Sequence, residues 1–549
     1  IYYAGNNTDG SAIWKVANVN NPGEWYDYTK KQWANAVTVQ PNKLTTYKNK
    51  PGTTINNNDV LGYWVYIPRY AYEVQRPNAI DRVVTDEYPL PDNVNITGNN
   101  NSPYNEHSIR NEFSIHFEKA TDTKKTPAET CNILNPTKEQ MWANGTPTAE
   151  ADPDNTNILA KDYRTTCVNE SGGAISRLYT DANTAANNTT WATHPAFSWG
   201  TDTAGYTELN GLWIGKFETT GTVANPTVKP NQHANIYEYI GEFYTMAKHI
   251  GAYDPSNTGG NDITANGTTL NATGQWTSLH NLSTATSHML KNSEWGAITY
   301  LASSKYGAGT NNVSINSAYP STSADADGRS SRYGITGCGP NNLERSTATY
   351  TDGTPLSAST IESATACSTD PELGSRRAYN GDIGQLASTT NNVYGIYDMS
   401  GGANEYVMGN LTGYDDQSES SSTSYTRSPI KPPYVDLYKE SLGFDSTSSG
   451  DTNLAWSYST GSRYYNNDVC TWGTCGGHAL HETKQYQSVS SYGQSWGGDY
   501  SDFVYSSFRW FHRGGVAGSG SYAGLFYSSS SNGVTINYDG FRSVLLAAP

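Results

Sequence analysis

The sequence predicts a β-rich α+β fold, and three observations lead to this prediction. Short runs in which aromatic or β-branched residues alternate with polar ones recur along the chain, separated by Gly, Asn and Pro. Only two stretches, Ile236–Ile250 and Ser293–Ser303, repeat apolar residues at the three- and four-residue steps of a helix. The 549 residues allow a large core, but the hydrophobic content of 36% means that long polar loops must surround it.

Strand signals begin at the N-terminus and predict a β-rich segment over residues 1–57. Ile1–Val39 contains the runs IYYAG, AIWKVA and EWYDYTKKQWANAVTV, with turns expected at Asn6–Gly10 and Asn21–Gly23. The aromatic residues of this segment are expected to pack inside the protein rather than to form a sugar-binding platform; they are Trp25, Tyr26, Tyr28 and Trp33.

A main domain is predicted over residues 58–549. Asp59–Val74 is the most apolar stretch of the first third and predicts a core strand that ends at Pro68, since proline cannot continue a sheet's hydrogen bonds. His107–Glu118 and Gly211–Glu218 predict further strands, and Trp191–Trp199 is expected to return the chain to the core.

Two helices complete the expected core. In Ile236–Ile250, the basic residues of the last turn and the following Gly251 are typical of a helix end. In Ser293–Ser303, Asn292 or Ser293 is expected to cap the first turn. The second helix presents one apolar face, formed by Trp295, Ile298, Leu301 and Ala302.

Three polar segments, near 120–198, 305–387 and 411–499, predict long loop-rich insertions. Each contains two of the six cysteines, and pairing of sequence neighbours is the simplest of the fifteen possible arrangements. Buried free thiols are the alternative, which the polar surroundings of these cysteines disfavour. Disulfides indicate an oxidising, extracellular setting. The predicted pairs are Cys131–Cys167, Cys338–Cys367 and Cys470–Cys475.

Composition limits the partners that can be expected. The formal net charge is −16, which disfavours binding to nucleic acid or to an anionic membrane surface. No apolar run has the length of a membrane-spanning helix. The sequence begins inside a strand-like run at Ile1, without a signal peptide, and we therefore expect a processed or truncated ectodomain.

The stretch Val393–Asn410 contains the most distinctive candidate for chemistry. Asp398 and Glu405 lie on either side of a turn at Gly401 and Gly402, where glycine permits a backbone path closed to other residues. Such a turn can bring two carboxylates and the intervening carbonyls to one point, which is the oxygen cluster that a hard cation binds. A tight turn with two solvated acids is the alternative.

Four stretches in order resemble signatures of the formylglycine-generating-enzyme family. YDMSGGANEY at 397–406 is similar to the central signature of that family, and GLWIGKFE at 211–218 is similar to its opening strand. LKNSEWGAITYLA at 290–302 resembles its helix, and RGG at 513–515 and GFR at 540–542 resemble its closing signatures. The resemblance implies a variant of the C-type lectin fold, here with the long insertions described above.

The resemblance also implies which chemistry to expect. The family uses two cysteines near the closing signature to bind copper and oxidise a thiol, but the stretch Arg513–Arg542 contains no cysteine. We therefore expect no copper, no catalytic residues and no enzyme activity, since hydroxyl groups cannot replace thiolates at a copper site. The family also binds a structural calcium ion, and the departures from its pattern are Gly402 and Asn404. The matching calcium ligands here are Asp398, Gly401, Ala403 and Glu405.

Between the RGG and GFR signatures, Phe508–Tyr538 is rich in Ser, Gly, Tyr and Asn. These residues combine adaptable hydrogen bonding with aromatic area, as in recognition loops. The arrangement of this stretch with respect to the RGG and GFR signatures also resembles the variable ligand-binding region of lectin-like proteins diversified by retroelements. An ordinary polar loop is the alternative. The candidate ligand-binding residues are Ser519, Tyr522, Tyr527, Ser529, Asn532 and Asn537.

These observations predict a non-enzymatic extracellular protein that recognises a cell-surface protein or glycan. Its expected place is a bacterial surface appendage such as a pilus-like filament. One alternative is a structural filament subunit, part of a homopolymer, that binds no separate ligand. Another is a receptor-binding protein of a phage tail fibre.

Overall fold

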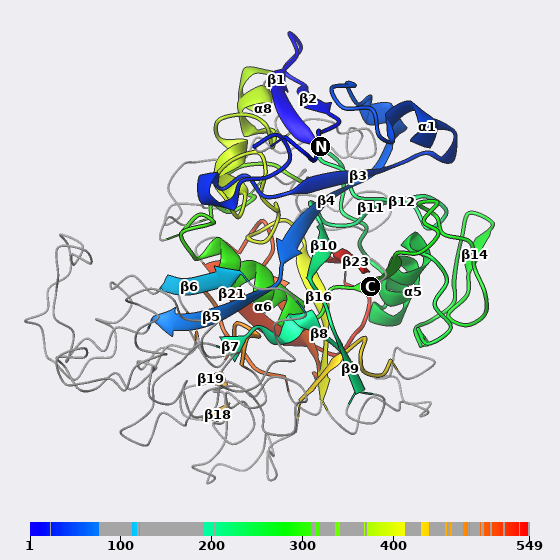
Figure 1. Ribbon diagram of the computed structural model, residues 1–549. Coiled ribbons are helices and arrows are strands. Elements are labelled where there is room, and N and C mark those ends of the chain that lie inside the picture. Colours follow the sequence, from blue (N-terminus) through cyan, green and yellow to red (C-terminus); the bar gives the residue numbers. More distant parts are fainter. Residues whose placement is uncertain are drawn as a thin grey trace, which may run out of the picture.

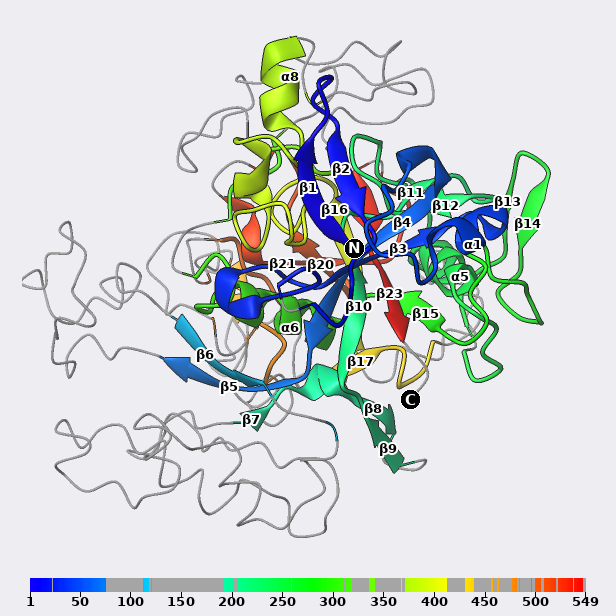
Figure 2. The same ribbon diagram turned by 45° about the horizontal axis from the view of Figure 1, so that its top comes forward.

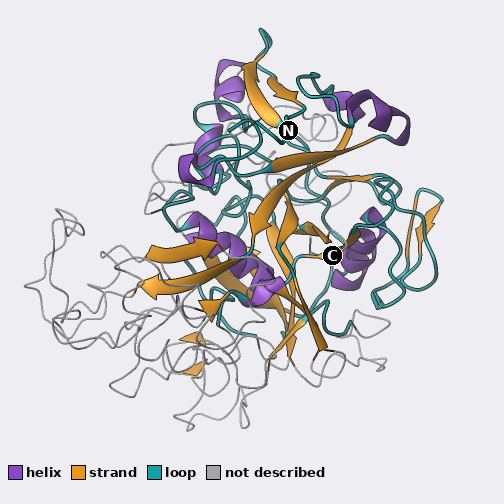
Figure 3. Cartoon of the chain, viewed as in Figure 1, coloured by secondary structure: helices purple, strands orange, loops and turns teal. Residues whose placement is uncertain are grey.

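The computed structural model is a β-rich α+β protein with two main sheets and few helices (Figure 3). The structure describes residues 1–75, 112–117, 192–201, 205–309, 313–317, 335–340, 371–411, 430–438 and 499–546, with gaps at 22, 258, 505–507, 520–521 and 537. It also describes the isolated positions 120, 367, 456–457, 462–463, 476–480, 483 and 495. The predicted insertions near 120–198 and 411–499 lie mostly outside these residues.

The described elements are as follows. The strands are β1 Tyr2–Asn6, β2 Ala12–Lys15, β3 Asn35–Val39, β4 Val60–Pro68, β5 Tyr70–Gln75, β6 Glu112–Phe117, β7 Ala192–Thr193, β8 Ser198–Thr201, β9 Gly205–Glu208, β10 Gly211–Gly215, β11 Thr220–Gly221, β12 Pro226–Thr227, β13 Ile263–Ala265, β14 Thr268–Leu270, β15 Thr286–Met289, β16 Asn404–Leu411, β17 Asp436–Tyr438, β18 Trp456–Ser457, β19 Ser462–Arg463, β20 Trp510–Gly514, β21 Gly524–Ser531, β22 Asp539–Phe541 and β23 Ser543–Leu546. The α-helices are α1 Leu44–Tyr47, α5 Ile240–Ile250, α6 Asn292–Ala302 and α8 Pro371–Arg377.

The central sheet is antiparallel and has the strand order β15-β23-β10-β4-β3. The last strand of the chain, β23, therefore lies between β15 and β10, and β3 from the N-terminal segment forms one edge. Strands from both ends of the sequence share one sheet, so this sheet forms only when distant parts of the chain meet (Figure 1).

The second sheet has the order β17-β16-β20-β21, and β22 runs parallel to β16 beside its first residues. β20 and β21 form an antiparallel hairpin, and β20 also pairs with β16. The stretches that were predicted to carry function, Asp398–Glu405 and Phe508–Tyr538, both contribute to this sheet.

The two predicted helices are present and flank the central strands, one on each side (Figures 1 and 2). α6 agrees closely with its prediction and is buried on every side. α5 starts four residues later than predicted, because Tyr237 has a left-handed backbone (φ 72°) that no helix can include. At the first turn, Glu242 Oε2 accepts from the Tyr239 N–H (2.9 Å), as in the second half of a capping box.

The stretch Asp59–Val74 forms two strands rather than one. β4 ends at Pro68 as predicted, and the chain resumes as β5 after Arg69. The Arg69 guanidinium is buried and forms an ion pair with Glu208 (Nη1–Oε2 2.7 Å), while donating to the Phe197 carbonyl. This anchored break redirects β5 into a separate sheet with β6 and β7.

The first 57 residues pack closely against the rest of the described chain. The Trp14 indole donates to the Tyr379 hydroxyl (2.9 Å), and Lys216 Nζ donates to Asn35 Oδ1 (2.8 Å). Figure 2 shows the β1–β2 hairpin beside α8. Tyr28 and Trp33 are buried, as expected for packing residues. Tyr26 is instead 50% exposed, and Trp25 is half-buried.

The predicted disulfide Cys338–Cys367 is confirmed, with both residues buried beside Ile335. The other four cysteines lie outside the described residues. Over the described ranges, we find no helix with the length and apolarity needed to cross a membrane.

Candidate functional site

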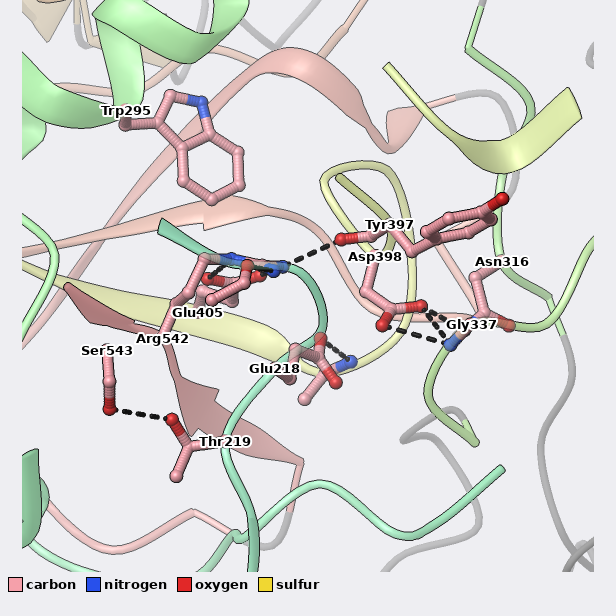
Figure 4. A network of polar contacts seen from close by, with 12 residues as sticks. Glu218, Thr219, Trp295, Asn316, Gly337, Tyr397, Asp398, Glu405, Arg542 and Ser543 are labelled. Carbon is pink, nitrogen blue, oxygen red and sulfur yellow. Dashed lines mark hydrogen bonds and ion pairs between the residues drawn. The ribbon is translucent and has the colours of Figure 1, made fainter. Parts of the chain in front are cut away.

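The predicted cation ligands Asp398 and Glu405 lie in a buried network with Arg542 of the closing strand. The Arg542 guanidinium forms an ion pair with Glu405, in which Nε is 3.1 Å from Oε2. It also donates to the carbonyls of Gly215 (2.8 Å) and Tyr397 (2.9 Å). Figure 4 shows Arg542 beside Glu405, with Asp398 and Glu218 next to them. Glu405 therefore has an arginine as its partner.

The glycine turn orients Asp398 toward amide donors. Asp398 has a left-handed backbone (φ 63°), and its Oδ1 accepts from Asn316 Nδ2 and from the Gly337 N–H, both at 2.8 Å. Asn316 and Gly337 come from the segment that was predicted as the insertion 305–387. Part of that segment thus contributes to the buried core.

Glu218 is the residue of this network that the sequence analysis missed. Its Oε1 accepts from the Ala403 N–H (2.8 Å), and its buried Oε2 has no hydrogen-bond partner among the described residues. Gly402 is required beside it, because a Cβ there would lie 2.6 Å from Glu218 Oε1. Glu218 ends the run GLWIGKFE, but nothing local in that run indicates that its carboxylate meets the glycine turn.

Three carboxylates and one guanidinium share this enclosed volume, which we call the acidic network: Glu218, Asp398, Glu405 and Arg542. Burial raises the pKa of Glu218 well above its usual range, and the charges of Asp398 and Glu405 raise it further. Burial also raises the pKa of Asp398 to about 6 and that of Glu405 to about 7, against the opposing effect of Arg542. The network therefore holds protons that ordinary carboxyl groups would release.

The charge of the acidic network suits a divalent cation, whereas its hydrogen bonding does not. Both oxygens of Glu405 contact Arg542, and the Asp398 oxygens accept from N–H groups. Gly401 and Ala403 frame the same turn, and among the carboxylate oxygens of the acidic network Glu218 Oε2 is the one without a donor in the described part of the chain. In the part of the chain that the structure describes, no three His, Cys, Asp or Glu side chains form a metal-binding group.

The predicted ligand-binding stretch forms the β20–β21 hairpin. His512 pairs with Ser529 and with Tyr406 across the sheet, and Arg513 pairs with Ser528. Because successive side chains of a strand point to opposite faces, Tyr406, His512 and Ser529 share one face and Arg513 lies on the other. Arg513 reaches α6, where its guanidinium lies over the Trp295 ring at 5.5 Å.

On the face of the sheet that carries His512 lies a buried polar cluster, which we call the polar floor, formed by Asn404, His512 and Asp539. The Asn404 amide lies 2.8 Å from His512 Nδ1, and His512 Nε2 lies 3.1 Å from Asp539 Oδ2. The parallel pairing of β16 with β22 brings Asn404 opposite Asp539. His512 Nδ1 is thus hydrogen-bonded to Asn404, and Nε2 faces the Asp539 carboxylate.

Tyr527 and Ser529 are half-buried above this floor, and Tyr522, in the turn before β21, is 51% exposed. We call these three residues the hairpin face. The Tyr527 ring packs against Tyr500 with ring centroids 5.6 Å apart. Burial raises the pKa of Tyr527 to about 12, with a further increase from Asp539, Tyr538 and Asp502.

The other predicted ligand-binding residues have different environments. Ser519 Oγ accepts from the Val516 N–H (3.1 Å), and Asn532 Oδ1 accepts from the Val534 N–H (3.4 Å), so both side chains stabilise turns. Asn537 lies outside the described residues. The structure places Tyr527 and Ser529 on the same face of β21, and Tyr522 in the turn that precedes this strand.

The polar floor itself was not predicted. Asn404 and Asp539 belong to motifs that the sequence analysis quoted, but their contact depends on the register of two parallel strands. No local pattern reveals that register, and no sequence signal pointed to His512.

The comparisons with protein-family models and with curated proteins identified no relative of this chain. No protein-family model matches the chain, and no curated protein matches its sequence.

Proposed function

We propose that this chain is a non-enzymatic recognition protein of the cell exterior and that its hairpin face binds a protein or glycan ligand. The observation that carries the proposal is the hairpin face itself, in which Tyr527 and Ser529 stand on β21, a strand held by pairing with β20, beside the polar floor. Side chains on such a support lose little conformational freedom on binding. We further propose its display on a bacterial surface appendage, as the sequence analysis expected.

We also propose that the fold is the C-type-lectin-like variant of formylglycine-generating enzymes. Support comes from the meeting of the resembling stretches in space. Glu218 of the opening strand bonds to the glycine turn, Glu405 of the central signature pairs with Arg542 of GFR, and Arg513 of RGG covers Trp295 of the helix. Figure 4 shows Glu218, Trp295, Glu405 and Arg542 in one region.

The binding proposal is tested with the double variant Tyr522→Ala/Tyr527→Ala on glycan and cell-surface-protein arrays. Binding should fall roughly tenfold or more, since exposed tyrosines commonly dominate an interface. The matched control is Tyr26→Ala, whose side chain is 50% exposed on another part of the molecule. A bound ligand that is unaffected by the double variant, or equally affected by the control, would contradict the proposed site. Circular dichroism should show both variants folded.

A structural calcium ion at Asp398, Gly401, Ala403 and Glu405 is proposed on the resemblance alone; to bind there, it would have to replace Arg542 and the N–H groups that these carboxylates contact. Calcium at 1 mM should then raise Tm, and a chelator should reverse the rise, because an ion that binds only the folded state stabilises it. The Asp398→Ala/Glu405→Ala double variant should lose this calcium-dependent rise. Equal Tm values for the native sequence in calcium and in chelator would rule out the ion.

A further inference from the structure

We infer that the ligand group received at the hairpin face is cationic: a lysine or arginine side chain presented by a protein partner. This inference rests on the proposed function and names the chemistry of its ligand. It depends on three observations, which are the tyrosines of the hairpin face, the acids near them and the orientation of Arg513 and Arg542 away from that face.

The tyrosines give the face its affinity for a cation. Tyr522 is exposed, Tyr500 and Tyr527 pack against each other, and Tyr538 is half-buried near Tyr527. The face of an aromatic ring carries partial negative charge and attracts an ammonium or guanidinium group within about 6 Å of its centroid. Arginine and lysine fit this environment better than a carboxylate or phosphate does.

Two buried carboxylates add to the negative potential at the same place. Asp539 and Asp502 both act on the Tyr527 hydroxyl and hold its proton. Asp502 lies under β21, where Ser530 Oγ donates to its Oδ2 (3.3 Å) and its own N–H donates to the Ser528 carbonyl (2.9 Å). The position of Asp502 is therefore set by the strand that carries the hairpin face.

Two of the described basic side chains of the closing stretch, Arg513 and Arg542, are directed elsewhere, while Arg509 is half-buried just before β20. No lysine follows Lys484 in the sequence. Arg513 lies on the opposite face of the sheet, where it donates to Asn292 Oδ1 (3.1 Å), and Arg542 is paired with Glu405. Of Arg513, Arg542 and His512, His512 is the one that lies below the hairpin face, between Asn404 and Asp539.

The polar floor also has an acceptor without a donor. Asn404 Oδ1 is buried and has no donor among the described residues, whereas Asp539 Oδ1 lies 3.4 Å from Asn404 Nδ2 and Asp539 Oδ2 lies 3.1 Å from His512 Nε2. A site with spare acceptors favours a ligand that carries donors, and both ammonium and guanidinium groups carry only donors.

The experiment measures the binding of fluorescent hexalysine to the full chain at 0.15 M salt, with hexaglutamate as the probe of opposite charge. Tyr527→Ala should weaken hexalysine binding roughly fivefold, as expected for loss of a cation–π contact. Asp502→Asn should weaken it roughly twofold, because the lost charge is partly screened. Tyr26→Ala and Asp382→Asn, on distant surfaces, should leave binding unchanged.

Three outcomes would overturn the inference. These are hexaglutamate binding as tight as hexalysine binding, equal losses in the distant variants, or binding to phosphatidylcholine vesicles in place of hexalysine, which would make the cation a lipid headgroup. The proposed function can survive each of them. An uncharged glycan that binds and is lost in Tyr522→Ala/Tyr527→Ala would uphold the hairpin face while refuting its preference for a cation.

Discussion

Replacing Arg542 with methionine should lower the free energy of unfolding by about 3–5 kcal/mol, the usual cost of removing one partner of a buried ion pair. Glu405 would lose its counter-charge in a site that also contains Glu218 and Asp398. The carbonyls of Gly215 and Tyr397 would lose their donor at the same time. Denaturation with urea, followed by tryptophan fluorescence, measures the change.

The matched control for this prediction is Arg376→Met. Arg376 also pairs with a carboxylate, Asp382 (Nη2–Oδ2 2.8 Å), but the two side chains are 51% and 64% exposed. Exposed ion pairs contribute about 0–1 kcal/mol, so this variant should be nearly as stable as the native protein. Adding Glu405→Met to Arg542→Met should restore part of the loss, because the carboxylate that had lost its direct partner is then removed. Similar small losses in both single variants would show that the buried pair does not stabilise the fold.

Glu218→Gln should stabilise the protein at pH 8 by more than about 1 kcal/mol and have little effect at pH 4.5. The folded state holds the Glu218 proton more tightly than the unfolded state does, since the pKa is raised by burial and by its acidic neighbours. Stability from such a group is fully present below the unfolded pKa and is lost as pH rises toward the folded pKa. Glutamine keeps the shape and the Ala403 hydrogen bond but has no proton to lose.

The measurement is the difference in unfolding free energy between Glu218→Gln and the native chain from pH 4.5 to 8, in chelator. Burial lowers the pKa values of His249 and His280 to about 4 and that of Lys248 to about 8, and these groups titrate in the opposite sense to Glu218. Because they are present in both chains, their contributions cancel in the difference. Asp382→Asn, at an exposed carboxylate, should give a flat difference over this range. A flat difference for Glu218→Gln would mean that its carboxylate is solvated or neutralised by another group.

Local pattern was sufficient to predict the elements of the core. The helix α6 and the strands β4 and β10 appear close to their predicted bounds, because periodicity over some ten residues already determines which side chains can be buried together. The start of α5 was predicted too early, since the left-handed backbone at Tyr237 leaves no trace in hydrophobic spacing. The end of β4 at Pro68 was predicted, but the separate strand β5 after it was not, since the Arg69–Glu208 ion pair at this break joins residues far apart in the sequence.

The candidate sites were predicted only in part. Sequence reasoning identified Asp398 and Glu405 from the glycine turn and Tyr522 and Tyr527 from composition. It missed Glu218, whose carboxylate bonds to a residue 185 positions away, and it assigned calcium ligands without the arginine partner of Glu405. It also included Ser519 and Asn532, whose side chains are used in turns.

The sequence by itself determined the β-rich class, the two helices and the Cys338–Cys367 pair, as well as the concentration of Tyr and Ser between RGG and GFR. Only the tertiary structure decided that Glu405 faces Arg542, that Glu218 joins them, and that Asn404, His512 and Asp539 lie together beneath the hairpin. The physical reason is the same in each case. A buried charge is stabilised by whatever group the sheet register places opposite it, and that register is set by strands from distant parts of the chain.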